Sequence, residues 1–281
     1  MMKTLLTQNQ YPPFMLRQIQ PYLYQQTIFG TCAEKNTLVV LPTGMGKTLI
    51  AMMLAAHRLQ NYPQTKVLIL APTRPLCDQH YETSKKHLEL PEEQIVLVTG
   101  HISPEKRKEI YEAAKIIIST PQTIEHDLIN KKYPIAETSL IVFDEAHRAM
   151  KDYSYVWIAS HYQQKAKHER ILALTASPGD DTETVQEIIQ NLGIEAIEFR
   201  LPTDPDVSPY VQELEFKKIH VSLPESLKQI QKNLKDCFYQ KLEDIKKNEY
   251  LTGPVHYFTK TQLLALQGQL QGKLAEGEKT P

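Results

Sequence analysis

Up to residue 199, short apolar runs alternate with longer segments in which apolar positions recur every three or four residues. Each run is four or five residues long and almost continuously apolar, as is typical of a strand buried on both faces of a parallel sheet. The runs lie at residues 38–41, 67–71, 95–99, 116–119, 140–143, 171–174 and 196–199. The helical period predicts helices at residues 47–60, 76–90, 104–114, 124–131 and about 148–167. This alternation predicts an α/β fold, in which right-handed βαβ units build a parallel sheet with flanking helices.

The pattern changes near residue 202. The stretch LPTDPDVSP holds three prolines in nine residues and is typical of a connector. Beyond it, two apolar stripes at three- and four-residue steps predict two amphipathic helices within residues 225–275, joined by a turn around Gly253 and Pro254. We therefore expect a first domain at residues 1–201, a connector at 202–224 and a helical segment at 225–281.

Composition narrows the class of protein. Hydrophobic residues make up 41% and charged residues 23% of the 281, which is an ordinary balance for a folded domain. The net charge of −1 provides no general basic field, so a nucleic-acid partner would have to be bound by a local site. The three cysteines lie far apart, no apolar run is long enough for a membrane helix, and no secretory signal is visible at the start. These features predict a cytoplasmic protein with no membrane partner.

The first predicted strand is followed by LPTGMGKT, residues 41–48, at the start of a predicted helix. Such a loop binds phosphate through its backbone N–H groups at a helix N-terminus, with glycines allowing the tight curvature. Lys47 can reach the β- and γ-phosphates, and the Thr48 hydroxyl can bind Mg²⁺. The strict pattern has glycine at position 41, where this chain has Leu41. The candidate nucleotide-binding residues of the loop are Thr43, Gly44, Met45, Gly46, Lys47 and Thr48.

The fifth predicted strand ends in VFDEAH, residues 142–147. Two adjacent carboxylates at a strand end near a phosphate loop suit Mg·ATP hydrolysis. Asp144 would hold the metal through its water shell, and Glu145 would orient and deprotonate the attacking water. A polar turn at the strand end is the alternative. His147 either couples hydrolysis to a nucleic-acid face or caps the following helix.

Three further strand ends carry polar groups, in APTRP (71–75), VTG (98–100) and STPQT (119–123). Hydroxyls, backbone amides and an occasional arginine on one sheet edge can contact nucleic-acid phosphates without reading bases. The candidate residues are Thr73, Arg74, Thr99, Gly100, Thr120, Pro121 and Gln122. The sixth strand ends in LTASPG, where Thr175 and Ser177 could link the ATP site to this face or form a simple hydroxyl turn.

The order TGMGKT, APTRP, TG, TPQ, DEAH and TAS resembles motifs I to III of superfamily 2 helicases. More narrowly, the stretches around residues 24–53, 139–150 and 174–200 resemble the archaeal Hef helicase-nucleases and their eukaryotic FANCM relatives. The resemblance implies a RecA-like ATP-binding lobe at residues 1–201, completed by the connector, and the start of a helical insert at 225–281. It also implies that Gln25 reads adenine, and Tyr22 stands where many relatives have arginine.

The resemblance further implies an ATP- and Mg²⁺-dependent helicase or translocase that acts on single-stranded or branched DNA, in an archaeal cytoplasm and associated with the nucleoid. The family's second RecA-like lobe carries an arginine finger in a Q-x-x-G-R-x-G-R run, which this sequence lacks, so a second lobe is an expected partner. This chain alone is expected to be nearly inactive.

Three other readings stay open. The nucleic acid along which the protein moves could be RNA, as in the similar Dicer and antiviral RNA-sensor helicases. The chain could be a nucleotide- or nucleic-acid-binding module without turnover. A P-loop kinase fits poorly, because the sequence shows no segment suited to be an acceptor-substrate lid.

Overall fold

The computed structural model describes residues 16–17, 20–177, 179, 182–210, 218, 221–247, 250 and 258–275. The chain divides into two compact units, residues 1–213 and 214–281. Each unit has its own hydrophobic cluster, so each is described by itself. Among the described residues, no helix has the length and apolar character needed to cross a membrane.

A parallel sheet of seven strands forms the centre of the first unit, in the order β3-β4-β2-β5-β6-β1-β7. Its strands are β1 Thr37–Val40, β2 Lys66–Leu70, β3 Ile95–Val98, β4 Ile116–Ser119, β5 Thr138–Asp144, β6 Ile171–Thr175 and β7 Ala196–Phe199. The α/β fold and the positions of the strands are confirmed. The main difference is β5, which begins two residues earlier than expected, at Thr138 rather than at residue 140.

Seven α-helices of the first unit are described: α1 Leu23–Glu34, α2 Lys47–Asn61, α3 Arg74–His87, α4 Pro104–Ala113, α5 Pro121–Ile129, α6 Ser154–Lys165 and α7 Thr182–Leu192. Short 3₁₀ turns lie at Glu92–Gln94, Ile135–Glu137, Ala146–Arg148 and Ser208–Tyr210. The helix predicted at about 148–167 is wrong at its start, because Lys151 adopts a positive φ of 52° in the turn before α6. Helices α1 and α7 are not among the predicted elements.

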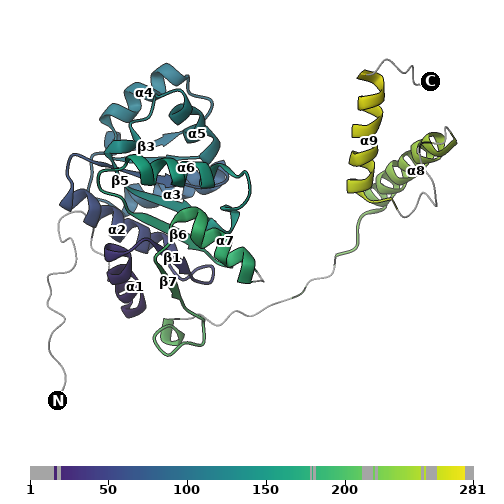
Figure 1. Cartoon of the computed structure of the whole chain (residues 1–281). Helices are drawn as coiled ribbons and strands as arrows, with labels where there is room; N and C mark the ends of the chain where they lie inside the picture. The colour runs from purple at the N-terminus through teal and green to yellow at the C-terminus, as the bar shows by residue number, and fades with distance from the viewer. Residues whose placement is uncertain are drawn as a thin grey trace. The chain divides into compact units, whose positions relative to one another are not determined.

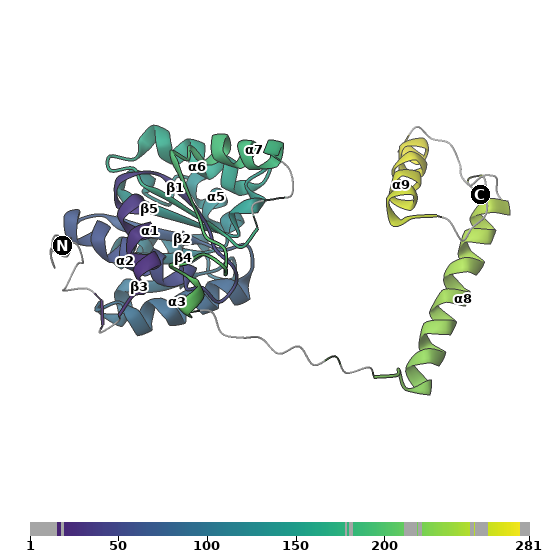
Figure 2. The ribbon, with the colours of Figure 1, turned by 90° about the horizontal axis from the view of Figure 1, so that it is seen from below.

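Alternate strand residues point to opposite faces of the sheet, as the pleat requires. Val39, Ile69 and Val142 belong to the cluster that also contains the buried residues of α1, α2 and α3. Leu38 and Phe143 belong to the opposite cluster, together with buried residues of α4 to α7. Figure 2 shows the sheet between α2 and α3 on one side and α6 and α7 on the other. Burial on both faces explains why strands β1 to β6 are almost continuously apolar. The edge strand β7 differs from the expectation, because Ile197 and Phe199 are exposed.

The first described part of the connector, residues 202–210, belongs to the first unit and packs on it. Val207 is fully buried in the α1–α3 cluster. Arg200, just after β7, donates from Nε to Asp206 at 2.9 Å. After β7 the chain therefore folds back, and residues 206 and 207 contact the first unit.

The second unit contains α8 Glu225–Lys247 and α9 Lys260–Ala275. Leu242 is buried among Tyr239, Ile245, Leu263, Leu266 and Phe258. Earlier on α8, the apolar side chains of Leu227, Ile230 and Leu234 are exposed. The predicted turn around Gly253 and Pro254 lies outside the described residues.

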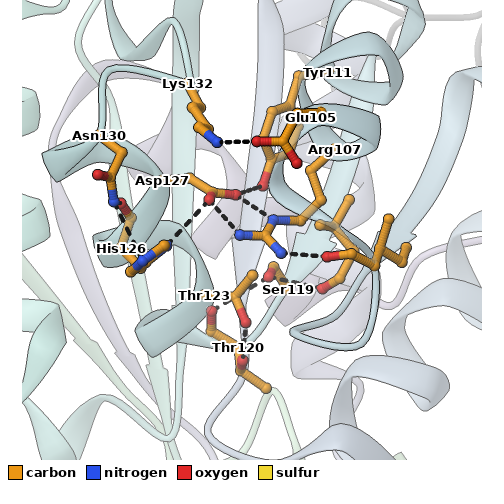
Figure 3. Close-up of polar contacts among 12 residues, drawn as sticks. Glu105, Arg107, Tyr111, Ser119, Thr120, Thr123, His126, Asp127, Asn130 and Lys132 are labelled. Carbon is orange, nitrogen blue, oxygen red and sulfur yellow. Dashed lines mark hydrogen bonds and ion pairs between the residues drawn. The ribbon is translucent and has the colours of Figure 1, made fainter.

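A buried ion pair joins α4 to α5 (Figure 3). Arg107 donates from Nε and Nη2 to the two oxygens of Asp127, at 2.6 and 2.5 Å. Tyr111 donates its hydroxyl to the same carboxylate at 2.6 Å. Burial acts to raise the pKa of Asp127, but the bonds from Arg107 and Tyr111 outweigh it, and that pKa is lowered. The pair fixes the two helices that begin just after β3 and β4.

We expect Asp127→Asn to lower the free energy of unfolding by about 3–5 kcal/mol, because it leaves the Arg107 guanidinium buried without a counter-charge. Urea-induced unfolding at neutral pH measures this loss. The contribution of the wild-type pair is complete above the unfolded pKa of about 3.9 and is lost as pH falls through the lower folded pKa. The control is Glu105→Gln, whose side chain is 78% exposed in its pair with Lys132 and should change little. Equal losses in both variants would contradict the prediction.

Candidate functional site

The candidate residues meet at one edge of the sheet because of the strand order. Strand β6 lies between β1 and β5, and β2 is the next neighbour of β5. Since all these strands are parallel, the segments that follow them emerge at the same edge, near α2 and α3 in Figure 1. The 41–48 loop, the DEAH tetrad and the segment after Thr175 are therefore neighbours in space.

The 41–48 loop turns on two glycines in the left-handed region. Gly44 has a φ of 85° and Gly46 a φ of 76°, and Gly46 directly precedes the first residue of α2. A Cβ on Gly46 would lie 2.3 Å from Nε2 of Gln25, so a side chain there would displace the Gln25 amide and would also strain the backbone. The first N–H groups of α2 have no partner within the helix and are available to an anion.

Lys47 lies over this loop. Its Nζ donates to the carbonyl oxygens of Leu41 and Pro42, at 2.8 and 3.3 Å. Burial lowers the pKa of the Lys47 ammonium from its ordinary value, and the nearby Asp144 and Glu145 act in the opposite direction. The Lys47 ammonium therefore contacts the loop and is influenced by the carboxylates of Asp144 and Glu145 at the end of β5.

Helix α1 is tied to the same loop. Gln25 is only 2% exposed and donates from Nε2 to the Met45 carbonyl at 3.4 Å, while its Oε1 accepts from the N–H of Tyr22 at 2.9 Å. Tyr24 donates its hydroxyl to the same Met45 carbonyl at 2.8 Å. The Tyr22 ring stacks on Tyr210 with centroids 4.1 Å apart. Sequence reasoning missed Tyr210, which lies in the expected connector, because no local pattern links it to residue 22.

Asp144 is the last residue of β5, and each of its two carboxylate oxygens has a hydrogen-bond partner. Oδ1 accepts from the N–H of Glu145 at 3.0 Å, and Oδ2 lies 2.8 Å from Nε2 of His80 on α3. Tyr155 of α6 donates its hydroxyl to the Asp144 carbonyl at 2.7 Å. Sequence reasoning identified neither His80 nor Tyr155, since each reaches Asp144 only through the fold.

Glu145 is a non-glycine residue in the left-handed region, with φ 51° and ψ 50°. Such backbone conformations cost free energy and concentrate at functional sites. The turn places the Glu145 carboxylate near His147, with Oε2 3.3 Å from Nδ1 of the ring. Glu145 is therefore directed away from the line of the strand by its own backbone.

His147 and Thr175, each of which had two possible roles in the sequence, contact one another in the structure. Helix α6 begins at Ser154, well after His147, so the capping alternative for His147 is wrong. Instead Nδ1 of His147 lies 3.2 Å from Oγ1 of Thr175. The hydroxyl turn is also present, because Thr175 donates to the Ser177 carbonyl at 2.9 Å. The DEAH segment and the end of β6 are thus in direct contact.

The predicted nucleic-acid residues lie at the ends of β2, β3 and β4. Thr73 precedes α3, and Arg74 is its first residue, with a side chain that is 60% exposed. Thr120 precedes α5 and contacts Thr123 through their hydroxyls at 3.0 Å (Figure 3). Pro121 and Gln122 are the first two residues of that helix. These residues start helices, whereas the sequence pattern placed the helix starts at 76 and 124.

Between β3 and α5 the surface is hollowed into a pocket of about 460 Å³. Gly100, Ser103, Gln122, Thr123 and His126 contribute to its lining. Ser119 donates to the carbonyl of Val98 at 2.8 Å and so fixes the ends of β3 and β4 to one another. Of the predicted nucleic-acid residues, Gly100 and Gln122 therefore line this pocket, and Thr99 and Thr120 are the residues that precede Gly100 and Pro121 in the chain.

Comparisons with known proteins agree with this arrangement. A family model described as DEAD/DEAH box helicase matches residues 19–185. The Hef helicase domain of Pyrococcus furiosus, known from a crystal structure, is 44% identical to this chain. The TM-score is 0.71, and the match covers 94% of this chain and 56% of that one.

Two curated relatives are similar over almost the whole chain. A protein of Methanocaldococcus jannaschii named as an ATP-dependent RNA helicase is 40% identical over 93% of this chain and 33% of its own length. The Drosophila melanogaster DNA helicase Fancm is 35% identical over 92% of this chain and 18% of its own length. The chain thus spans a third or less of these two relatives. Because the family model matches more than half of this chain, from the Gln25 segment to beyond the DEAH tetrad, the chain belongs to the DEAD/DEAH box helicase family.

Proposed function

We propose that this chain is the ATP-binding motor lobe of a DNA helicase or translocase that acts on single-stranded or branched DNA in repair or fork processing. The observation that supports this proposal best is the meeting of the 41–48 loop, Asp144 and Glu145 at one sheet edge. His147 and Thr175 link that edge to the end of β6. The names of several similar proteins, including Drosophila Fancm and Schizosaccharomyces pombe fml1, also describe DNA helicases.

The nucleotide part of the proposal rests on the chemistry of the loop. ATP phosphates would accept from the N–H groups at the start of α2, with Thr43, Gly44, Met45 and Gly46 forming the curved backbone around them. Lys47 would exchange its bonds to the Leu41 and Pro42 carbonyls for the β- and γ-phosphates. Gln25 and the exposed Tyr22–Tyr210 stack lie beside this loop. The adenine ring of the bound ATP would lie next to them.

Magnesium fits the donor set on this edge. Thr48 and Asp144 offer a hydroxyl and a carboxylate, and Mg²⁺ prefers such oxygen ligands while keeping several of its waters. No group of three or more His, Cys, Asp or Glu suited to hold a metal occurs among the described residues, so a dedicated all-protein cage is not offered there. Bound between Thr48 and the water-linked Asp144, the ion would neutralise charge on the phosphates.

Glu145 would take the proton of the attacking water. Its carboxylate lies on the strained turn after β5, near Nδ1 of His147. His147 in turn contacts Thr175, and Ser177 closes the hydroxyl turn behind it. We propose that this chain of contacts transmits the state of the nucleotide towards the nucleic-acid edge.

The nucleic-acid part of the proposal rests on backbone recognition. Arg74 is exposed, and the hydroxyls of Thr73, Thr99 and Thr120 stand at neighbouring strand ends. Such groups contact phosphates without distinguishing bases. RNA is the second candidate track, because the Methanocaldococcus relative is named as an RNA helicase.

We also propose that turnover needs a second RecA-like lobe, which would supply an arginine to the charge that develops on the γ-phosphate. That contact contributes about 10³–10⁵ in rate in related motors. The lobe described here would then bind nucleotide and nucleic acid while hydrolysing ATP near the background rate. The segment 225–281 would be the start of a helical insert.

Lys47→Ala should abolish Mg·ATP binding, because it removes the charge that faces the β- and γ-phosphates. Calorimetric titration with Mg·ATP measures the loss directly. The matched control is Lys165→Ala, which removes the same charge from the exposed end of α6 and should bind as the wild type does. Equal affinity in the wild type and in Lys47→Ala would contradict the nucleotide site.

Arg74→Ala should weaken single-stranded DNA binding about equally for all sequences and lower the slope of log K against log salt by about one. Fluorescence anisotropy with several DNA and RNA oligonucleotides at a series of salt concentrations provides both quantities. Lys86→Ala, at the other end of α3, is the control for charge. A loss confined to one sequence would show base readout instead, and preference for RNA would favour the second candidate.

A further inference from the structure

His80 contacts the carboxylate of Asp144, and no sequence motif indicates this contact. It lies in the middle of α3, is 3% exposed, and places Nε2 at 2.8 Å from Oδ2 of Asp144. The other ring nitrogen, Nδ1, is buried without a hydrogen-bond partner. The buried ring therefore has one nitrogen that contacts Asp144 and one that has no hydrogen-bond partner.

The two ring nitrogens together indicate the tautomer. Oδ2 of a carboxylate accepts, so Nε2 must carry the hydrogen in this contact. In the neutral ring Nδ1 then holds only a lone pair, whereas a buried Nδ1–H would be a donor without an acceptor. A hydrogen on Nε2 therefore accounts for the contact with Asp144. His80 is thus a fixed donor directed at Asp144.

The contact completes the restraint of Asp144. Oδ1 accepts from the Glu145 N–H, and the backbone carbonyl accepts from Tyr155. These two bonds fix the backbone and one carboxylate oxygen, and His80 fixes the other oxygen from a different element. Rotation of the carboxylate about its Cβ–Cγ bond would break the His80 bond.

We propose that His80 is a positioning residue, which holds the Asp144 carboxylate in the orientation that receives the water shell of Mg²⁺. This inference rests on the proposed function, because it takes Asp144 as the water-linked metal residue. Partners of this kind orient the groups that bind the metal, and their loss typically costs about 10- to 100-fold in metal affinity or activity. Helix α3 begins at Arg74, so the proposed nucleic-acid contact and the Asp144 partner belong to one helix.

The test compares donor loss with donor replacement. His80→Leu fills the buried space without a donor, His80→Asn is too short to reach Asp144, and His80→Gln places an amide Nε2 near the position of the ring Nε2. Ser84→Ala is the control, since it removes a buried hydroxyl that donates to the His80 carbonyl at 2.7 Å but leaves the His80 ring in place. The dissociation constant of a non-hydrolysable ATP analogue is measured by calorimetry on the whole chain, with Mg²⁺ and with EDTA.

We expect His80→Leu and His80→Asn to weaken binding in Mg²⁺ by about tenfold and to leave binding in EDTA unchanged. His80→Gln should restore most of the Mg²⁺-dependent affinity, and Ser84→Ala should match the wild type. In an Asp144→Asn background, His80→Asn should cause no further loss. Thermal unfolding of each variant shows which are folded, and the Asn variant carries the test if the Leu variant is not.

Wild-type affinity in His80→Asn, or an equal loss in His80→Gln and His80→Asn, would overturn the role of His80 while leaving the nucleotide site in place. Binding by the wild type that does not depend on Mg²⁺, or that survives Lys47→Ala, would overturn the proposed function and this inference together. The two failures are therefore distinguishable in one set of titrations.

Discussion

Parallel pairing of β6 between β1 and β5 is the constraint on which the site depends. The pairing brings the glycine loop after β1, the carboxylates after β5 and the hydroxyl turn after β6 to one edge, although they lie far apart in the sequence. Pairing of β2 with β5 adds the start of α3 to the same edge. Burial of the sheet on both faces stabilises this order, because each strand from β1 to β6 has apolar side chains in two separate clusters.

Rigid support for the polar groups comes from buried partners on neighbouring elements. Tyr155 fixes the Asp144 backbone from one face of the sheet, and His80 contacts its carboxylate from the other. The strained turn at Glu145 persists because β5 holds the residues before it, and Ala146 is fully buried after it. Preorganisation of this kind fixes the carboxylates before any nucleotide arrives, which lowers the cost of arranging them during a reaction.

The proposed nucleic-acid edge follows a different physical principle. It is built from helix starts and hydroxyls at the ends of β2, β3 and β4, and the buried pair of Arg107 and Asp127 fixes α4 against α5 behind it. Recognition by backbone amides and hydroxyls needs little positive charge, so a net charge of −1 is compatible with it. Arg74, an exposed cation at this edge, is consistent with a contact to phosphate rather than to a base.

The sequence by itself determined the seven strands, the phosphate-type loop and the family, because each depends on local properties. A continuous apolar run indicates a strand that is buried on both faces. Gly44 and Gly46 indicate a left-handed backbone conformation, which does not depend on the rest of the fold. Helix α1 escaped prediction because Thr27, Gly30 and Thr31 are weak helix formers, and its stability comes from packing Ile28 and Cys32 into the core beside α2.

The His80–Asp144 contact, the Tyr22–Tyr210 stack and the link from His147 to Thr175 were decided only by the tertiary structure. Their partners come from elements that are adjacent only after the strands have paired. Local periodicity carries no information about that pairing, so the sequence could name the candidate reacting groups but not the side chains that hold them in place.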